Sequence, residues 1–162
     1  MISWADVCAS PHLKDLPYKI ETNRFGKILL SPSHPWRGGF QYRIGALLDR
    51  LMSAGQIITE CAVETTDGTR VAEVAWISKN RLAPHKKAFS LPIAPEICVE
   101  IISGSNTHEE MIGKMQLYFA AGASEVWLCD EDGRMEFHLS DSTGPMPASR
   151  LCHEFPTQLE PL

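Results

Sequence analysis

Apolar residues recur along this chain at the spacings of helices and strands. Between residues 39 and 52 they recur every three or four positions, as on one face of an amphipathic helix: Phe40, Ile44, Leu47, Leu48 and Leu51. A second helix is predicted over residues 107–122, where Asn106 or Thr107 can cap the N-terminus and Gly122 can end the last turn.

Strands are predicted where apolar residues alternate or run together between turn residues. Two segments, each broken by a glycine-containing turn, are expected to be β-hairpins, and three further segments are expected to be single strands. The hairpins are 18–32 and 125–140, and the strands are 56–65, 70–78 and 95–103. A mixed sheet with helices packed on it accommodates this order most simply, so the expected fold class is α/β (α+β).

The same pattern suggests how the chain is divided. Residues 1–17 contain Pro11 and Pro17 and are expected to form a loosely ordered N-terminal lead-in, with residues 18–162 as a single domain. Between the second and third strands, residues 79–95 are predicted to be a polar loop. The proline-rich tail from Asp141 is predicted to be loop with at most short edge strands.

Two carboxylates interrupt strands that are otherwise apolar. Glu73 lies in residues 70–78 and Glu100 in residues 95–103, and both strands are apolar on both faces, as in the interior of a covered sheet. A buried carboxylate is costly unless it is protonated, paired or bound to a metal. If the strands are neighbours, both groups can face one cavity and bind a hard cation such as Mg²⁺. The alternative for each glutamate is a salt bridge or a wet sheet edge.

Lys114 is the candidate cationic partner of these acids. It lies in the middle of the second predicted helix, directly after the Glu100 strand, on the helix face that also carries Tyr118. A helix returning over the sheet can bring its ammonium group toward the carboxylates. The alternative is a solvated surface lysine.

Composition narrows the class of protein. The chain has 162 residues, of which 44% are hydrophobic and 22% charged, as expected for a globular protein. The net charge of −5 argues against bulk coating of nucleic acid but allows a local basic patch. Five cysteines without a CxxC indicate neither a zinc site nor a disulfide framework. With no signal peptide or apolar span, a cytoplasmic protein with no membrane partner is expected.

The residues considered so far resemble a known family. The segments YKIETNRFGKILLSPSHP, TECAVETTDGTRVAEVAWIS, PEICVEIISGSN and EEMIGKMQLYFAAGASEVWLCD are similar to the Uma2 (DUF820) family, restriction-endonuclease-like proteins of the PD-(D/E)XK nuclease superfamily. The resemblance runs from about Tyr18 to Leu139, and SRLCHEFPTQLE resembles the family's closing segment. It implies a restriction-endonuclease-like mixed sheet flanked by helices, with an N-terminal β-hairpin.

The resemblance also implies an assignment of site residues. The acid of the "PD" element falls at Glu73, the "E" element at Glu100 and the lysine at Lys114, while Glu21 matches an N-terminal glutamate that often joins the site. Tyr118 matches a tyrosine one turn beyond the lysine and is a candidate substrate contact. Two positions depart from the pattern: "PD" reads Ala72-Glu73, and Ile102 stands where a standard strand lysine would be.

The function implied is metal-dependent hydrolysis of a phosphodiester bond in nucleic acid, most simply DNA. Glu73, Glu100 and the backbone carbonyl of Ile101 are expected to bind Mg²⁺ or Mn²⁺, with Lys114 and Glu21 completing the catalytic set. Four basic residues of the 79–95 loop are candidate phosphate contacts, although a solvated loop explains them equally well; they are Lys79, Arg81, Lys86 and Lys87.

Other function classes remain to be weighed against this one. Zinc-protease, P-loop, dinucleotide and α/β-hydrolase motifs are absent from the sequence. The alternative from a different class is a nuclease fold that no longer cuts and acts as a binding or oligomerisation module. A homodimer is possible by analogy with nucleases that cut both strands.

Overall fold

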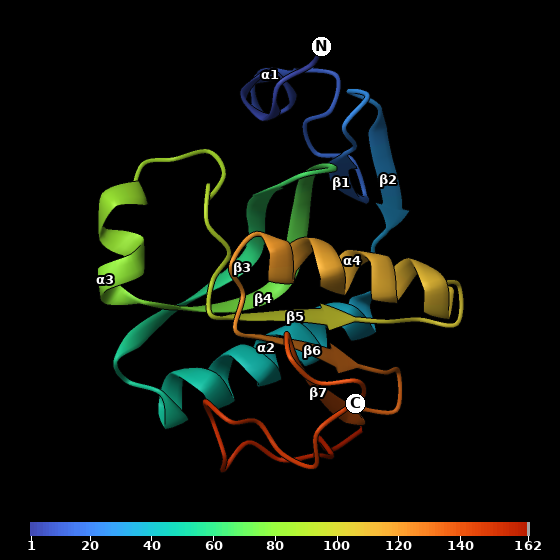
Figure 1. The fold of residues 1–162 in the computed structure, drawn as a ribbon. Helices are drawn as coiled ribbons and strands as arrows, with labels where there is room; N and C mark the ends of the chain where they lie inside the picture. The colour runs from blue at the N-terminus through green and yellow to red at the C-terminus, as the bar shows by residue number, and fades with distance from the viewer. Residues whose placement is uncertain (162) are drawn as a thin grey trace.

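The computed structural model describes residues 1–161 as a five-stranded mixed sheet covered on both faces, with a separate hairpin at one end (Figure 1). The strand order is β3-β4-β5-β6-β7. The strands are β3 Gly55–Thr65, β4 Gly68–Ser78, β5 Ile97–Ile101, β6 Glu125–Cys129 and β7 Met135–Leu139. The predicted fold class is therefore confirmed, together with the order of its main elements.

Within residues 1–161, one pair of neighbouring strands in the main sheet, β5 and β6, is parallel. The other three ladders are antiparallel: short turns connect β3 to β4 and β6 to β7, and a longer segment, residues 79–96, connects β4 to β5. Helix α4 (His108–Ala120) makes the crossover between β5 and β6, which a parallel pair requires. Thr107 caps α4 and is part of a capping box with Glu110.

The two faces of the sheet have separate hydrophobic cores. Helix α2 (Pro35–Leu51) packs on one face through Phe40, Ile44 and Leu48, which lie against Trp127 and its neighbours. Helix α4 packs on the other face through Met115 and Tyr118. Strands covered on both sides in this way explain why β4 and β5 are apolar throughout.

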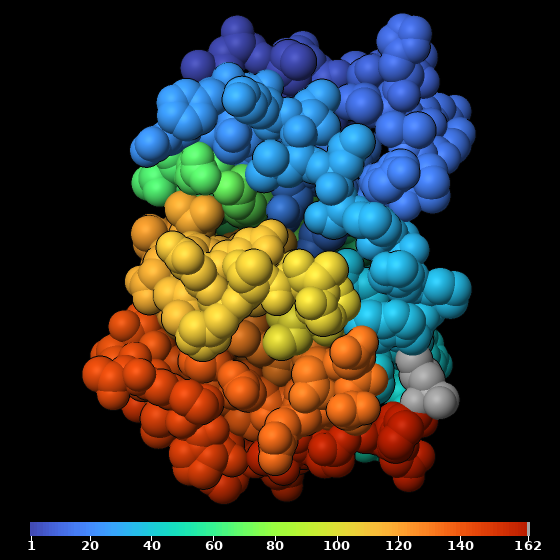
Figure 2. All heavy atoms as spheres, turned by 90° about the vertical axis from the view of Figure 1, so that its right-hand side faces the viewer, coloured from blue at the N-terminus to red at the C-terminus, as the bar shows by residue number. Residues whose placement is uncertain are grey.

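The N-terminal hairpin forms a second, two-stranded sheet. Strands β1 (Tyr18–Thr22) and β2 (Ile28–Pro32) pair antiparallel, as predicted, and β1 packs against β4. In Figure 2 this hairpin and the residues before it form the blue layer above the yellow and orange atoms of α4. The hairpin therefore overhangs one end of the main sheet.

Two predictions about loops were wrong. The lead-in contains helix α1 (Trp4–Ala9), where Ser3 and Asp6 form a capping box that satisfies the first turn. The 79–95 loop begins with helix α3 (Lys79–Leu82), capped by Ser78, and a 3-10 turn at Ala83–His85. Both helices are too short to show an apolar period, and their signal is the cap alone. The tail from Asp141 is mostly loop, as predicted.

Candidate functional site

The two acids predicted from the strand pattern lie side by side. The β4–β5 ladder pairs Val74 with Val99 and Ala75 with Cys98, so the next position along it brings Glu73 opposite Glu100. Both side chains reach the same ammonium: Lys19 Nζ lies 3.1 Å from Glu73 Oε1 and 3.2 Å from Glu100 Oε2. Glu73 is 4% exposed and Glu100 3% exposed, so two like charges are buried together.

Helix α4 supplies a second cation from the opposite side of Glu100. Lys114 Nζ lies 3.0 Å from Glu100 Oε1 and 2.8 Å from Glu21 Oε1. The Tyr118 hydroxyl, one turn further along, donates a 2.7 Å hydrogen bond to Glu100 Oε1. Glu21 also accepts a 2.7 Å hydrogen bond from the backbone N–H of Val71. The predicted set of Glu21, Glu73, Glu100 and Lys114 is thus one contiguous cluster.

A third cation comes from the first turn of α2. The Arg37 guanidinium donates to the carbonyl oxygen of Ile101, and its Nη2 lies 3.9 Å from Glu73 Oε1. Its Nε is buried and has no hydrogen-bond partner within residues 1–161. Three buried carboxylates therefore meet three cations, one each from β1, α2 and α4.

This arrangement shifts the pKa values of the groups at its centre. Burial raises the pKa of Glu100, but Lys114, Lys19 and the Tyr118 hydroxyl outweigh burial and hold that pKa below its usual value. Burial by itself would lower the pKa of Lys19. The negative charges of Glu100 and Glu73 outweigh burial, so the pKa of Lys19 lies above its usual range. Both groups are therefore charged at neutral pH.

A cleft of about 380 Å³ opens from this cluster to the surface between the hairpin and α4. In Figure 2 it lies where the blue atoms of the hairpin adjoin the yellow atoms of α4. Charged residues of both signs line it: Lys19, Glu21, Arg37, Asp67, Arg70, Glu100, Glu110 and Lys114. A polar or phosphate-bearing ligand suits such walls better than an apolar one.

Sequence reasoning missed two members of the cluster. Lys19 lies two residues before Glu21 in β1, and strand alternation alone would have placed both side chains on one face. Arg37 follows Pro35 in the first turn of α2, and no local pattern distinguishes it from an ordinary surface arginine.

Other predicted site residues lie elsewhere or are buried. Tyr118 has no exposed surface, and its hydroxyl bonds to Glu100. No residue of the 79–95 segment lines the cleft. Helix α3, with which the segment begins, lies on the left in Figure 1 and strand β2 of the hairpin on the right. Arg81 there pairs with Glu96 at 3.3 Å and donates to backbone carbonyls, while the lysines of this segment are exposed. Contact between this segment and a substrate stays a prediction.

The oxygens of the cluster fit a hard divalent cation. Glu73 Oε1 and Glu100 Oε2 converge on one position, that of the Lys19 ammonium, and the Ile101 carbonyl oxygen accepts a hydrogen bond from Arg37, which lies beside Glu73. All three are oxygen donors of the kind that Mg²⁺ and Mn²⁺ take in proteins. Among residues 1–161, no group of three or more His, Cys, Asp or Glu side chains is placed to hold a metal ion.

Comparison with known proteins shows the family of the chain. The family model Uma2, described as "Putative restriction endonuclease", matches residues 10–158. The chain belongs to the Uma2 family. The match includes the hairpin, the sheet and both long helices, and so contains every member of the cluster.

A solved structure has the same fold as this Uma2 protein. It is described as a putative nuclease belonging to DUF820 from Anabaena variabilis ATCC 29413, with a TM-score of 0.75 and 16% sequence identity, covering 99% of this chain and 95% of that one. No curated protein matches the sequence. Within the described part of the chain, no helix has both the length and the apolar character needed to cross a bilayer.

Proposed function

We propose that this Uma2 protein is a divalent-metal-dependent nuclease that hydrolyses phosphodiester bonds in DNA. The observation that carries the proposal is the meeting of Glu73 and Glu100 at one cation position, 3.1 and 3.2 Å from the same ammonium. Family membership supports nuclease chemistry at this place. The buried cysteines of the protein are all free thiols, which supports a location in a reducing compartment such as the cytoplasm.

Each residue of the cluster has a role that follows from its contacts. Glu73, Glu100 and the Ile101 carbonyl would hold Mg²⁺ or Mn²⁺, which supplies an acidified water and polarises the phosphate. Lys114 would donate to the water or to the phosphate oxygens from its position beside Glu100. Glu21, fixed by the Val71 N–H, orients Lys114. Tyr118 orients Glu100 from the buried side.

A cleavage assay tests the proposal directly. Purified protein is incubated with single- and double-stranded DNA in Mg²⁺, in Mn²⁺ and in EDTA. We expect cleavage in metal only, reduced by about 100-fold or more in Glu100→Gln and in Lys114→Met. Glu109→Gln is the matched control, because this exposed glutamate lies in the first turn of the same helix and faces away from the cluster.

The result separates an enzyme from a module that binds without cutting. Equal cleavage by the wild type and both site variants, each shown to be folded by circular dichroism, would contradict the proposed site. Metal binding without cleavage of any DNA or RNA would favour the non-cutting module instead, in which the altered Ala72-Glu73 element has lost turnover.

A further inference from the structure

Lys19 is at the centre of the cluster but comes from outside the main sheet. It belongs to the β1–β2 hairpin, and its ammonium bonds to both Glu73 and Glu100. Its side chain lines three separate cavities, of about 460, 380 and 160 Å³. Space therefore adjoins Lys19 on more than one side, although its side chain is only 8% exposed.

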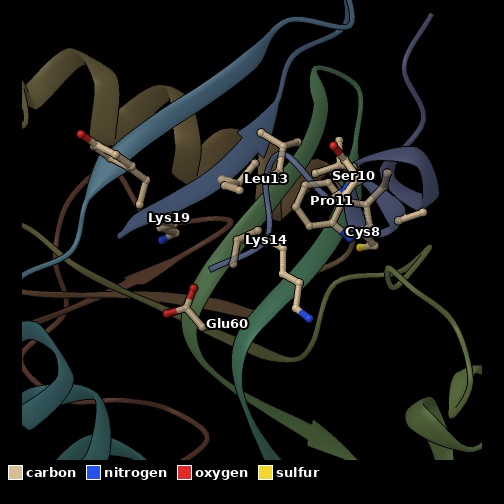
Figure 3. Close-up of a pocket in the computed structure, with 13 residues that line it drawn as sticks. Cys8, Ser10, Pro11, Leu13, Lys14, Lys19 and Glu60 are labelled. Carbon is tan, nitrogen blue, oxygen red and sulfur yellow. The ribbon is translucent and has the colours of Figure 1, made fainter. Parts of the chain in front are cut away.

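Glu60 faces two of these three cavities. It lies in β3, where the pairs Thr59–Val74 and Cys61–Ala72 continue the ladder on either side, but the Glu60–Glu73 position between them is not paired. Gln41 donates instead to the Glu73 carbonyl oxygen at 2.8 Å and to Glu60 Oε1 at 2.7 Å. Figure 3 shows Glu60 and Lys19 at the wall of the largest of the three cavities.

The backbone of Glu60 is held in an unfavourable conformation. Its φ is 51°, in the left-handed region that non-glycine residues avoid. A non-glycine residue keeps this conformation where the surrounding structure enforces it, and residues of this kind cluster at functional sites. Partial burial raises the pKa of Glu60, and the negative charge of Glu73 adds to this. A cation beside Glu60 would relieve that repulsion.

A divalent cation and the Lys19 ammonium cannot occupy the same position. Two positive charges within a few ångströms repel strongly in a buried site, so one must leave when the other enters. Glu60 lines two of the cavities that Lys19 lines. Within residues 1–161 its carboxylate accepts only the Gln41 hydrogen bond. It is therefore available to an incoming ammonium.

We propose that Lys19 is the resident cation of the Glu73–Glu100 pair and that Glu60 receives its ammonium when a divalent cation binds. The inference rests on the metal dependence proposed above and adds two positioning residues to it. It explains how two carboxyl groups can lie buried side by side without metal.

Calorimetric titration with Mn²⁺ alone tests this without any nuclease assay. We expect the Mn²⁺ dissociation constant to fall about tenfold in Lys19→Met, because no ammonium has to be displaced. In Glu60→Gln it should rise about fivefold, because the displaced ammonium has lost its acceptor. Lys14→Met is the control: this exposed lysine lines the same cavity as Lys19 and should leave the constant unchanged.

The double variant distinguishes an exchange of partners from a general effect of charge. If Glu60 acts through Lys19, Glu60→Gln has no effect on Mn²⁺ affinity in the Lys19→Met background. An equal effect of Glu60→Gln in both backgrounds overturns the inference, as does unchanged or weaker binding in Lys19→Met.

Stability gives a second measurement, because Lys19→Met leaves two buried carboxylates without their shared cation. Its melting temperature without metal should lie below that of the wild type and should rise more on Mn²⁺ addition. A rise of the melting temperature on Mn²⁺ addition that is no larger in Lys19→Met than in the wild type counts against the proposed transfer of the ammonium to Glu60.

The outcomes also separate this inference from the proposed function. If the Mn²⁺ dissociation constants of Lys19→Met and Glu60→Gln change as expected and no nucleic acid is cut, the proposed function fails and this inference stands. If neither the wild type nor Lys19→Met binds Mn²⁺, the proposed function and this inference both fail.

Discussion

Glu100 and Glu125 are both buried carboxylates in strands of the main sheet, yet their partners differ. Glu125 accepts hydrogen bonds from Trp127 Nε1, from Ser149 Oγ and from two backbone N–H groups of the C-terminal tail. Glu100 is paired with two ammonium groups and a phenol. Neutral donors fix the tail on the sheet at Glu125, whereas at Glu100 the partners include the charged side chains that line the cleft.

The lowered pKa of Glu100 makes stability depend on pH. Because its folded pKa lies below the unfolded value of about 4.3, it contributes stability above that value, which is lost as pH falls through the folded pKa. We expect the free energy of unfolding to decrease between about pH 5 and pH 3. The decrease should be less steep in Glu100→Gln, as measured by urea unfolding at several pH values.

The exposed Glu109→Gln variant is the control for that experiment and should keep the wild-type dependence on pH. Identical slopes for the wild type and Glu100→Gln would mean that this carboxyl does not contribute to the acid sensitivity of the fold.

At the scale of elements, the site depends on how the hairpin docks on the sheet. The tight turn between β3 and β4 contains Gly68, whose φ is +83°. A Cβ at this position would lie 2.5 Å from the Thr22 carbonyl oxygen at the end of β1. Thr22 in turn accepts a hydrogen bond from the backbone N–H of Thr69 through its side chain. This turn therefore sets the position of the strand that carries Lys19 and Glu21.

Gly68→Ala should destabilise the protein by about 1–3 kcal/mol, because it combines left-handed backbone strain with a clash against β1. Gly113→Ala is a matched control within α4, where an added Cβ meets nothing within 4 Å. It should stabilise the helix by about 0.5–1 kcal/mol. Thermal and urea unfolding measure both changes, and a neutral Gly68→Ala would show that the turn and hairpin are not tightly packed.

On the scale of the whole molecule, the basic 79–95 segment does not line the cleft, and helix α3 at its start lies across the molecule from strand β2 of the hairpin (Figure 1). A net charge of −5 gives the protein no general attraction for DNA. Binding of DNA therefore depends on which basic side chains lie on the surface that DNA contacts. Arg37 and Lys114 line the cleft, whereas Lys86 and Lys87 are exposed and do not line it. The position of the cleft favours its own cations as the phosphate contacts.

DNA affinity measured by fluorescence anisotropy separates these two surfaces. With a hydrolysis-resistant phosphorothioate duplex, Mn²⁺ and fixed salt, we expect Arg37→Gln to weaken binding about tenfold. The combined Lys86→Gln and Lys87→Gln variant should change it by less than about twofold. The opposite ranking would show that the 79–95 segment is the main DNA contact.

The local pattern of the sequence was sufficient for the main elements and for the two acids. Periodicity predicts α2 and α4, alternation predicts the strands, and Glu73 and Glu100 are conspicuous because apolar strands exclude unpaired charge. The place of Lys114 on the helix after the Glu100 strand made it a candidate, with a solvated surface lysine as the alternative, and the resemblance to Uma2 assigned it to the site. The resemblance alone added Glu21. Short capped helices such as α1 were missed because six residues carry no period.

Tertiary structure alone decided which charges meet. The antiparallel β4–β5 register brings Glu73 opposite Glu100, and docking of the hairpin and the start of α2 brings Lys19 and Arg37 to them. The sequence neighbours of a side chain determine whether it lies on a polar or an apolar face. The pairing of Lys19 with Glu73 and Glu100, which are 54 and 81 positions away, depends on strand register and packing. The acids and Lys114 were therefore predictable from the chain, whereas Lys19 and Arg37 were not.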